Sequence, residues 1–289
     1  METDSLDRHS PASLRKHIDQ VKERHKLPSA PGVVTKVMSL LKDPDFNARD
    51  LARFISDDPA LAARTLSLAR SPLYAQRRRA STVHEAVRGM GYKAVRSLVI
   101  ATAAQSFMTR KSKIGDKLWS HSLATALAAR ILARRSRMDD PEMAFLAGLL
   151  HDMGHMILCE GDPRGFAQLI SEVEQSDESL NLKELALYRF DHASVAFALL
   201  DHWNLDEQVN EAVIAHHDST ESRNGSLAST VAMADYLCGK AGLGFYGEVF
   251  HPDSDQLHAF GCADESSLNL LVEEVRRAFE QENLLFREN

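Results

Sequence analysis

The sequence predicts an all-α fold, and three observations support that prediction. Apolar residues recur at helical spacing in one segment after another, helix-start signals precede several segments, and no stretch of useful length alternates apolar and polar residues as a strand would. The 289 residues are 44% hydrophobic and 26% charged, which is ordinary for a globular protein with a substantial core. We therefore expect a helical N-terminal half that packs on a second helical bundle.

The first helices are expected to be short. The charged segment Ser13–His25 predicts a surface helix, which ends at Leu27–Pro31 because proline cannot continue a helix. Apolar residues within Val33–Leu41 then repeat at helical spacing. Asn47 is a favourable N-cap for the next helix, and Asp58–Pro59 combines an N-cap with proline at the first helical position.

Two further signals complete the N-terminal half. Thr82 and Glu85 fit a capping box, in which the hydroxyl and the carboxylate each accept a hydrogen bond from a backbone N–H group at the helix start. Gly89 and Gly91 bracket the expected end of that short helix. The strongly apolar segment Tyr92–Met108 predicts a long helix that is buried on most sides.

A second series of helices follows a basic, polar seam at Thr109–Gly115. The alanine-rich segment Trp119–Ala133 allows close helix contacts, and the apolar segment Ala144–Leu150 leads directly into His151. The seam divides the chain into an N-terminal tail (1–26), a helical subdomain (27–112) and a second subdomain (113–289). Further helices are expected over Pro163–Val173, Leu182–Tyr188, His192–Trp203, Glu207–His216, Leu227–Gly239 and Ser266–Glu280.

Composition and charge exclude several classes of protein. A net charge of −7 and a pI near 6.0 argue against a broad nucleic-acid-binding face. The three cysteines have no CxxC spacing, which is typical of reduced thiols and not of a disulfide framework or a zinc knuckle. The polar N-terminus has no signal-peptide core, and no apolar run is long enough to span a membrane. We expect a cytoplasmic protein with neither a nucleic-acid partner nor a membrane partner.

The order of histidines and aspartates is the most informative feature for function. The chain has 13 histidines, so a single histidine indicates little, but two adjacent pairs, His151-Asp152 and His216-His217, lie within helix-like apolar stretches. Imidazole and carboxylate together bind borderline divalent ions such as iron, manganese, nickel or zinc. The expected metal ligands are His121, His151, Asp152, His192, His216, His217 and Asp235.

Helical geometry predicts how several of these side chains meet. His151 and His155 are four residues apart and share a helix face, and the two oxygens of Asp152 could bridge two metals. His216 and His217 project about 100° apart on a helix, so both are more plausible as ligands near a helix end. Asp235 is a lone carboxylate in an apolar segment, which is costly unless it is paired, hydrogen-bonded or bound to metal.

At these residues the chain resembles a known superfamily. The series His121, His151-Asp152 and Asp235 looks like that of the HD metal-dependent phosphohydrolases, and His192 with His216-His217 resembles the dinuclear members. Further motifs resemble the HDOD family, the HD-related output domains of bacterial signal transduction, over roughly Leu27 to Glu280. These motifs are Leu27–Pro31, Ile55–Leu61, Ser71–Tyr74, Val87–Gly91, Val95–Val99, Ala234–Leu237 and Gly242–Gly244.

The resemblance implies a cytoplasmic signalling output module with an HD-like second subdomain. It also implies a site for two divalent metal ions, with iron or manganese favoured over nickel or zinc. Its partner would be a signalling protein or a nucleotide. The alternative is a metal-dependent phosphohydrolase or phosphodiesterase acting on a nucleotide or cyclic dinucleotide, with Asp152 and His155 as catalytic residues. A third alternative is a structural ion that joins helices without turnover.

Two departures separate the chain from the related HD-GYP phosphodiesterases. No Gly-Tyr-Pro segment follows His217, where the chain continues with Asp218–Gly225, and His155 stands where those enzymes tend to carry lysine. His155 could be a ligand, a phosphate contact or a helix-cap residue. The run Arg77–Arg79 is expected to be a solvated loop. The remaining histidines are expected to be ordinary core or surface residues: His9, His17, His25, His84, His202, His251 and His258.

Overall fold

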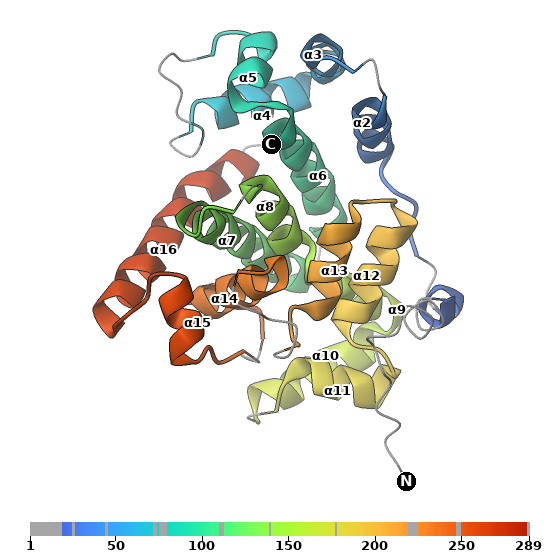
Figure 1. Ribbon diagram of the computed structural model, residues 1–289. Coiled ribbons are helices and arrows are strands. Elements are labelled where there is room, and N and C mark those ends of the chain that lie inside the picture. Colours follow the sequence, from blue (N-terminus) through green and yellow to red (C-terminus); the bar gives the residue numbers. More distant parts are fainter. Residues whose placement is uncertain are drawn as a thin grey trace.

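The computed structural model confirms the all-α fold. Its described residues are 19–24, 27–43, 46–71, 74, 80–109, 113–138, 140–176, 178–218, 225–246 and 250–287. These residues form fifteen α-helices, α2 to α16, and no strand (Figure 1). The predicted surface helix Ser13–His25 lies mostly outside the described residues, although 19–24 are helical. The run Arg77–Arg79 lies wholly outside them.

Five helices form the N-terminal half, and side chains cap three of them as the sequence predicts. Asn47 Oδ1 accepts from the Arg49 N–H at 2.9 Å, and Asp58 caps the next helix with Pro59 in its first turn. Thr82 and Glu85 form the predicted capping box. The five helices are α2 (Gly32–Lys42), α3 (Ala48–Ser56), α4 (Pro59–Ala69), α5 (Val83–Met90) and α6 (Tyr92–Met108).

The predicted end of α5 is confirmed. The helix ends at Met90, between Gly89 and Gly91. Gly91 alone makes the turn into α6, with a φ of +84° that residues with a Cβ rarely adopt. The small apolar core of this half packs the helices together through Val37, Leu51, Ala52, Ile55, Leu61, Val83, Val87, Val95 and Val99.

Ten helices form the second bundle, with α7 at its centre (Figure 1). Helix α7 packs against α8, α14 and α16. The approach of α7 to α8 requires Gly148, because a Cβ there would lie 2.8 Å from the Thr125 carbonyl oxygen. The helices are α7 (Lys113–Arg135), α8 (Pro141–Leu150), α9 (Gly154–Gly161), α10 (Pro163–Glu174), α11 (Leu180–Tyr188), α12 (His192–His202), α13 (Glu207–Ala215), α14 (Leu227–Lys240), α15 (Ser254–Ala259) and α16 (Glu265–Arg287).

The two helical series share one large apolar core. It contains Met38 and Leu98 from the first series together with Leu127 and Leu146 from the second. Helix α6 packs on α7 and α8, and α16 reaches back to α4. The packing of an N-terminal helical half on a second bundle is therefore confirmed, whereas the predicted three-part division of the chain stays a prediction.

Two helices, α9 and α15, were not predicted from the sequence. Both are short. Only three residues separate the end of α8 at Leu150 from the start of α9 at Gly154, so the sequence contains no separate start signal for α9. None of the described helices combines the length and the apolar character that crossing a membrane requires.

Candidate metal centre

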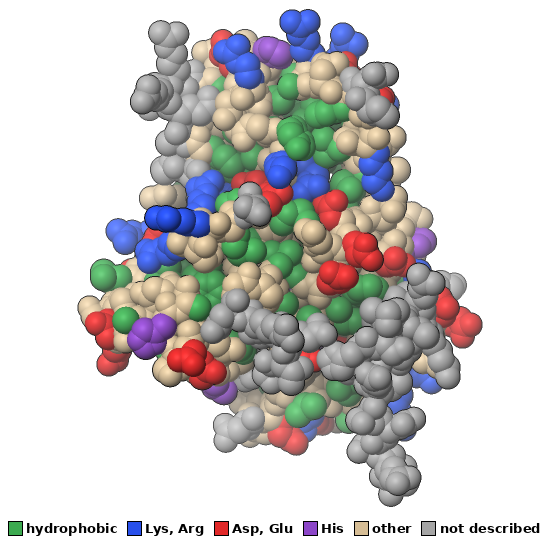
Figure 2. All heavy atoms as spheres, viewed as in Figure 1, with side chains coloured by type: hydrophobic (Ala, Val, Ile, Leu, Met, Phe, Trp, Pro, Cys, Tyr) green, Lys and Arg blue, Asp and Glu red, His purple; other side chains and the backbone are tan. Residues whose placement is uncertain are grey.

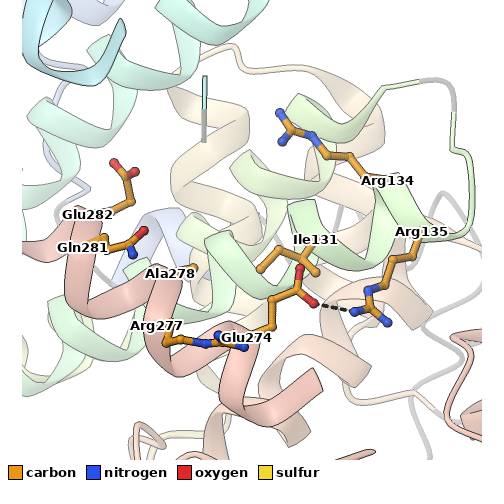
Figure 3. Close-up of a pocket in the computed structure, with 8 residues that line it drawn as sticks. All are labelled: Ile131, Arg134, Arg135, Glu274, Arg277, Ala278, Gln281 and Glu282. Atoms are coloured by element: carbon orange, nitrogen blue, oxygen red, sulfur yellow. Dashed lines mark hydrogen bonds and ion pairs between the residues drawn. The ribbon is translucent and has the colours of Figure 1, made fainter. Parts of the chain in front are cut away.

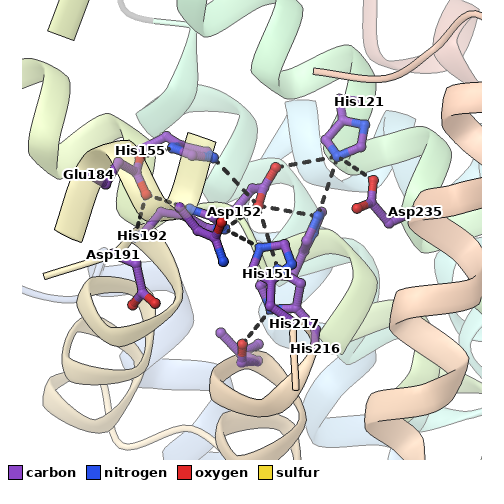
Figure 4. Close-up of polar contacts among 12 residues, drawn as sticks. His121, His151, Asp152, His155, Glu184, Asp191, His192, His216, His217 and Asp235 are labelled. Carbon is purple, nitrogen blue, oxygen red and sulfur yellow. Dashed lines mark hydrogen bonds and ion pairs between the residues drawn. The ribbon is translucent and has the colours of Figure 1, made fainter. Parts of the chain in front are cut away.

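The predicted ligand residues converge where the ends of several helices meet (Figure 4). His121 projects from the middle of α7, and His151 is the C-cap of α8. Asp152 lies in the turn before α9, which carries His155. The remaining residues come from the first residue of α12, the end of α13 and the body of α14: His192, His216, His217 and Asp235.

The first group of donor atoms surrounds His121. Its Nε2 atom lies 3.3 Å from His151 Nε2, 3.3 Å from Asp152 Oδ2 and 3.3 Å from Asp235 Oδ1. Donor atoms that share a cation at about 2.1 Å lie about 3.0–3.4 Å from one another. His121, His151 and Asp235 are accordingly one group that could hold a metal ion.

The second group of donor atoms surrounds the other oxygen of Asp152. Its Oδ1 atom lies 3.3 Å from His192 Nε2, 3.6 Å from His155 Nε2 and 3.9 Å from His216 Nε2. His217 Nε2 is 2.8 Å from His192 Nε2. Asp152 Oδ2 thus faces His121 and Oδ1 faces His192, as the two oxygens of a bridging ligand would. His151 lies between the two groups, because its Nε2 atom is 3.3 Å from Asp152 Oδ1 and 3.3 Å from His121 Nε2.

In five of the six rings, the nitrogen that points away from the centre is held by a hydrogen-bond acceptor. The Nδ1 atoms of His121, His151 and His216 donate to backbone carbonyls, and those of His155 and His192 donate to a carboxylate. A ring that donates from Nδ1 keeps its Nε2 lone pair free for a metal. The acceptors are Leu243 O at 3.0 Å, Gly148 O at 2.9 Å, Val213 O at 2.6 Å, Glu184 Oε1 at 2.8 Å and Glu184 Oε2 at 2.7 Å.

Glu184 is the functional residue that the sequence reasoning missed. It projects from α11, is fully buried, and accepts hydrogen bonds from His155, from the His192 ring and from the His192 backbone N–H at 2.9 Å. Its segment, Leu180–Tyr188, has the composition of an ordinary surface helix, and Lys183 beside it is partly exposed. No signal in the sequence distinguished this glutamate from a solvated one.

The chain also makes close backbone contacts around the centre. A Cβ on Gly154 would lie 2.0 Å from the His192 carbonyl oxygen, so only glycine lets the start of α9 approach the start of α12. This contact brings His155 beside His192, and their ring centroids are 4.0 Å apart. Phe245 covers one side of the centre, with its ring 5.0 Å from the His155 ring and 6.3 Å from the His121 ring.

The electrostatics of the centre suit a cation. Burial would raise the pKa of Asp152, but the surrounding imidazoles outweigh burial and hold that pKa well below its ordinary value. Burial and the neighbouring His192 lower the pKa of His216 to about 4, and burial holds the pKa of His217 well below its ordinary value. These two rings are therefore neutral at pH 7, the form in which imidazole binds metal.

His192 differs from these neutral rings. Burial lowers its pKa, but the charge and hydrogen bond of Glu184 outweigh burial and raise it to about 9. Without a metal, His192 is thus an imidazolium that can donate to His217. A cation in the second group would replace that proton.

A buried nitrogen without a hydrogen bond gives further evidence, independent of the ligand pattern, that the donor set fits divalent cations. The His216 Nε2 atom is buried and has no hydrogen-bond partner among the described residues. An unsatisfied buried nitrogen costs about 1–3 kcal/mol, and coordination would satisfy it.

The centre is also accessible, because the Asp235 side chain is 24% exposed and His217 is partly exposed. Most of the loop after His217, residues 219–224, lies outside the described residues.

Comparison with known proteins agrees with this architecture. A family model of the HDOD domain matches residues 27–219. The crystal structure of an HDOD domain protein with unknown function from Geobacter sulfurreducens is similar over 95% of this chain and 97% of that one, with 28% identity and a TM-score of 0.74. A candidate phosphohydrolase from Shewanella amazonensis SB2B shares the fold, with 24% identity, a TM-score of 0.70 and coverage of 96% and 98%.

A curated relative extends the comparison to a longer protein. An uncharacterised protein of Treponema pallidum (strain Nichols) is 25% identical over 228 residues, which make up 78% of this chain and 43% of that protein. The chain therefore spans less than half the length of this relative. Because the family model matches well over half of the chain, and five of the seven motifs lie within residues 27–219, the chain belongs to the HDOD family.

Proposed function

We propose that the chain is a signal-transduction output module whose His/Asp centre holds two divalent cations bridged by Asp152. The bridging arrangement carries the proposal: Asp152 Oδ2 faces His121, and Asp152 Oδ1 faces His192. Nitrogen and carboxylate donors without thiolate suit iron or manganese, with nickel or zinc as alternatives. A candidate signal transduction protein of Marinobacter aquaeolei VT8 shares the fold, at 22% identity and a TM-score of 0.72.

In this proposal the cations act on the shape of the module. The ligands come from α7, α9, α12 and α14 and from the ends of α8 and α13, so two cations would fix the relative positions of six helices. A surface built on those helices would then depend on metal occupancy. The partner that reads this surface is a signalling protein or a nucleotide.

Elemental analysis tests the proposal directly. Protein purified without a metal-affinity tag should contain about two equivalents of iron or manganese, and the Asp152→Ala variant should lose them because both groups share that residue. Retention of full metal content in the variant would contradict a bridging role. Absence of metal in the parent protein, even after reconstitution, would remove the metal centre from the account.

Partial exposure of Asp235 and His217 favours a second candidate function, metal-dependent phosphoester hydrolysis. Bound divalent cations would supply Lewis acidity toward a phosphoryl oxygen. Asp152 would hold both cations, and His155, whose Nδ1 proton is tied to Glu184, would orient a phosphoryl oxygen or transfer a proton at Nε2. Turnover of p-nitrophenyl phosphate or bis(p-nitrophenyl) phosphate by metal-loaded protein, lost in His155→Gln at unchanged metal content, would support this function. No turnover in either substrate class would contradict it.

A further inference from the structure

A second potential ligand site lies outside the metal centre, between the end of α7 and the middle of α16. It is a cavity of about 620 Å³ with an apolar floor formed by Ile131 and Ala278 (Figure 3). On the face shown in Figure 2, Lys and Arg side chains gather at the left, where these helices meet in Figure 1. The volume falls within the range of about 300–1,000 Å³ that is usual for small-molecule pockets.

Three arginines give this cavity a positive wall in a chain of net charge −7. Arg134 and Arg135 end α7, and Arg277 projects from α16. Glu274 forms an ion pair with Arg135. The Arg277 Nε atom donates to the Glu273 carbonyl at 3.2 Å, which holds the guanidinium beside the cavity.

A buried acid completes the lining. Glu282 is 2% exposed, and its Oε2 atom has no hydrogen-bond partner among the described residues. Burial raises the pKa of this carboxyl group, although a hydrogen bond with Ser71 and the charge of Arg130 oppose the shift. The amide of Gln281 next to it can donate a hydrogen bond to an anion.

We propose that this cavity binds a phosphorylated small molecule of about nucleotide size, whose phosphoryl groups would pair with the exposed Arg134 and Arg277 side chains at its rim. Planar guanidinium groups match phosphoryl oxygens in pairs and do so better than lysine. The floor of Ile131 and Ala278 would receive an apolar part of the ligand. The cavity would thus serve as an input site for a small anionic signal, beyond the function proposed for the metal centre.

The cavity is separate from the metal centre, although α7 contributes to both. His121 and Arg134 are on the same helix, and a rise of 1.5 Å per residue places them about 20 Å apart along its axis. One small ligand cannot reach both. Binding in the cavity therefore does not require metal, which allows the two proposals to be tested independently.

Calorimetric titration with inorganic pyrophosphate in EDTA tests this proposal. The parent protein and Asp152→Ala should bind pyrophosphate equally, because neither needs metal for this site. The Arg134→Gln/Arg277→Gln double variant should bind at least about tenfold more weakly, because it loses charge-assisted hydrogen bonds. The matched control is Arg49→Gln/Arg164→Gln, which removes the same charge from exposed positions elsewhere and should bind like the parent.

A second variant separates a lost site from a lost fold. Gln281→Trp fills the cavity from an exposed position and should also abolish binding, with an unchanged circular dichroism spectrum. Equal binding by the arginine double variant and its control would overturn the proposal. So would loss of binding in Asp152→Ala, which would place pyrophosphate at the metal centre, or no binding by the parent protein at about 5 mM pyrophosphate.

Discussion

Replacement of Glu184 by glutamine should weaken one metal position and leave the other intact. The carboxylate accepts one hydrogen bond from the His155 ring and another from the His192 ring. A glutamine amide has a single acceptor oxygen, and its NH2 group donates. One of the two imidazoles must then accept at Nδ1, carry its proton on Nε2 and lose the lone pair that faces Asp152.

The expected size of this effect follows from the role of the carboxylate. Loss of a partner that orients a ligating histidine typically costs 10–100-fold in metal affinity, or about 1.4–2.7 kcal/mol. The cost should fall only on the group around His192, because His121 and His151 donate to backbone carbonyls that the substitution does not touch. The first cation should therefore bind as in the parent protein.

Equilibrium dialysis of metal-free protein against a series of Mn²⁺ concentrations, followed by elemental analysis, measures both positions. The matched control is Glu211→Gln, the same change at an exposed site on α13. The variant should show one parent-like equivalent and one weakened equivalent. Two parent-like equivalents in Glu184→Gln would refute the reasoning, and equal weakening of both would show that Glu184 acts on the whole fold.

Three further predictions concern the fold and the protons of the centre. Gly154→Ala should lower the free energy of unfolding in urea by about 1–3 kcal/mol, because the backbone must move to accept the new Cβ. The control Gly32→Ala should not destabilise the protein, because a Cβ there meets nothing within 4 Å. Because the pKa of His192 is raised from 6.5 to about 9, its protonation stabilises the metal-free protein fully below pH 6.5, and that contribution is lost as pH rises through 9. Metal binding at pH 7 should therefore release a proton, which calorimetry in buffers of different ionisation enthalpy measures. A metal affinity that did not rise with pH would contradict this prediction. Glu142→Ala should lower the free energy of unfolding in urea by about 3–5 kcal/mol, because the fully buried Arg130 guanidinium loses its carboxylate partner at 2.9 Å. A loss below about 1 kcal/mol would contradict the pairing.

The sequence predicted best those elements whose signals are local. Helix α6 begins and ends at the predicted residues, and the capping box at Thr82 and Glu85 forms as expected. Both follow from residues within one or two turns of each other. The end of α5 at Met90, between Gly89 and Gly91, follows from an equally local signal, because glycine permits the backbone turn after a helix.

Features that depend on packing between helices far apart in the sequence were harder to predict. Glu184 orients two imidazoles only because α11 lies beside α9 and α12. The residues next to Glu184 in the sequence do not indicate this packing. The carbonyl of Leu243 and the ring of Phe245 likewise reach the centre from the segment after α14. The predicted ligands themselves were identifiable because their spacing resembles that of a known superfamily.

The measurement that tests the central claim most directly is diffraction from metal-loaded crystals at the absorption edge of the bound metal. Two anomalous peaks on either side of the Asp152 carboxylate are expected, one beside His121 and one beside His192. A single peak, or none after reconstitution with iron and manganese, would contradict a dinuclear centre bridged by Asp152.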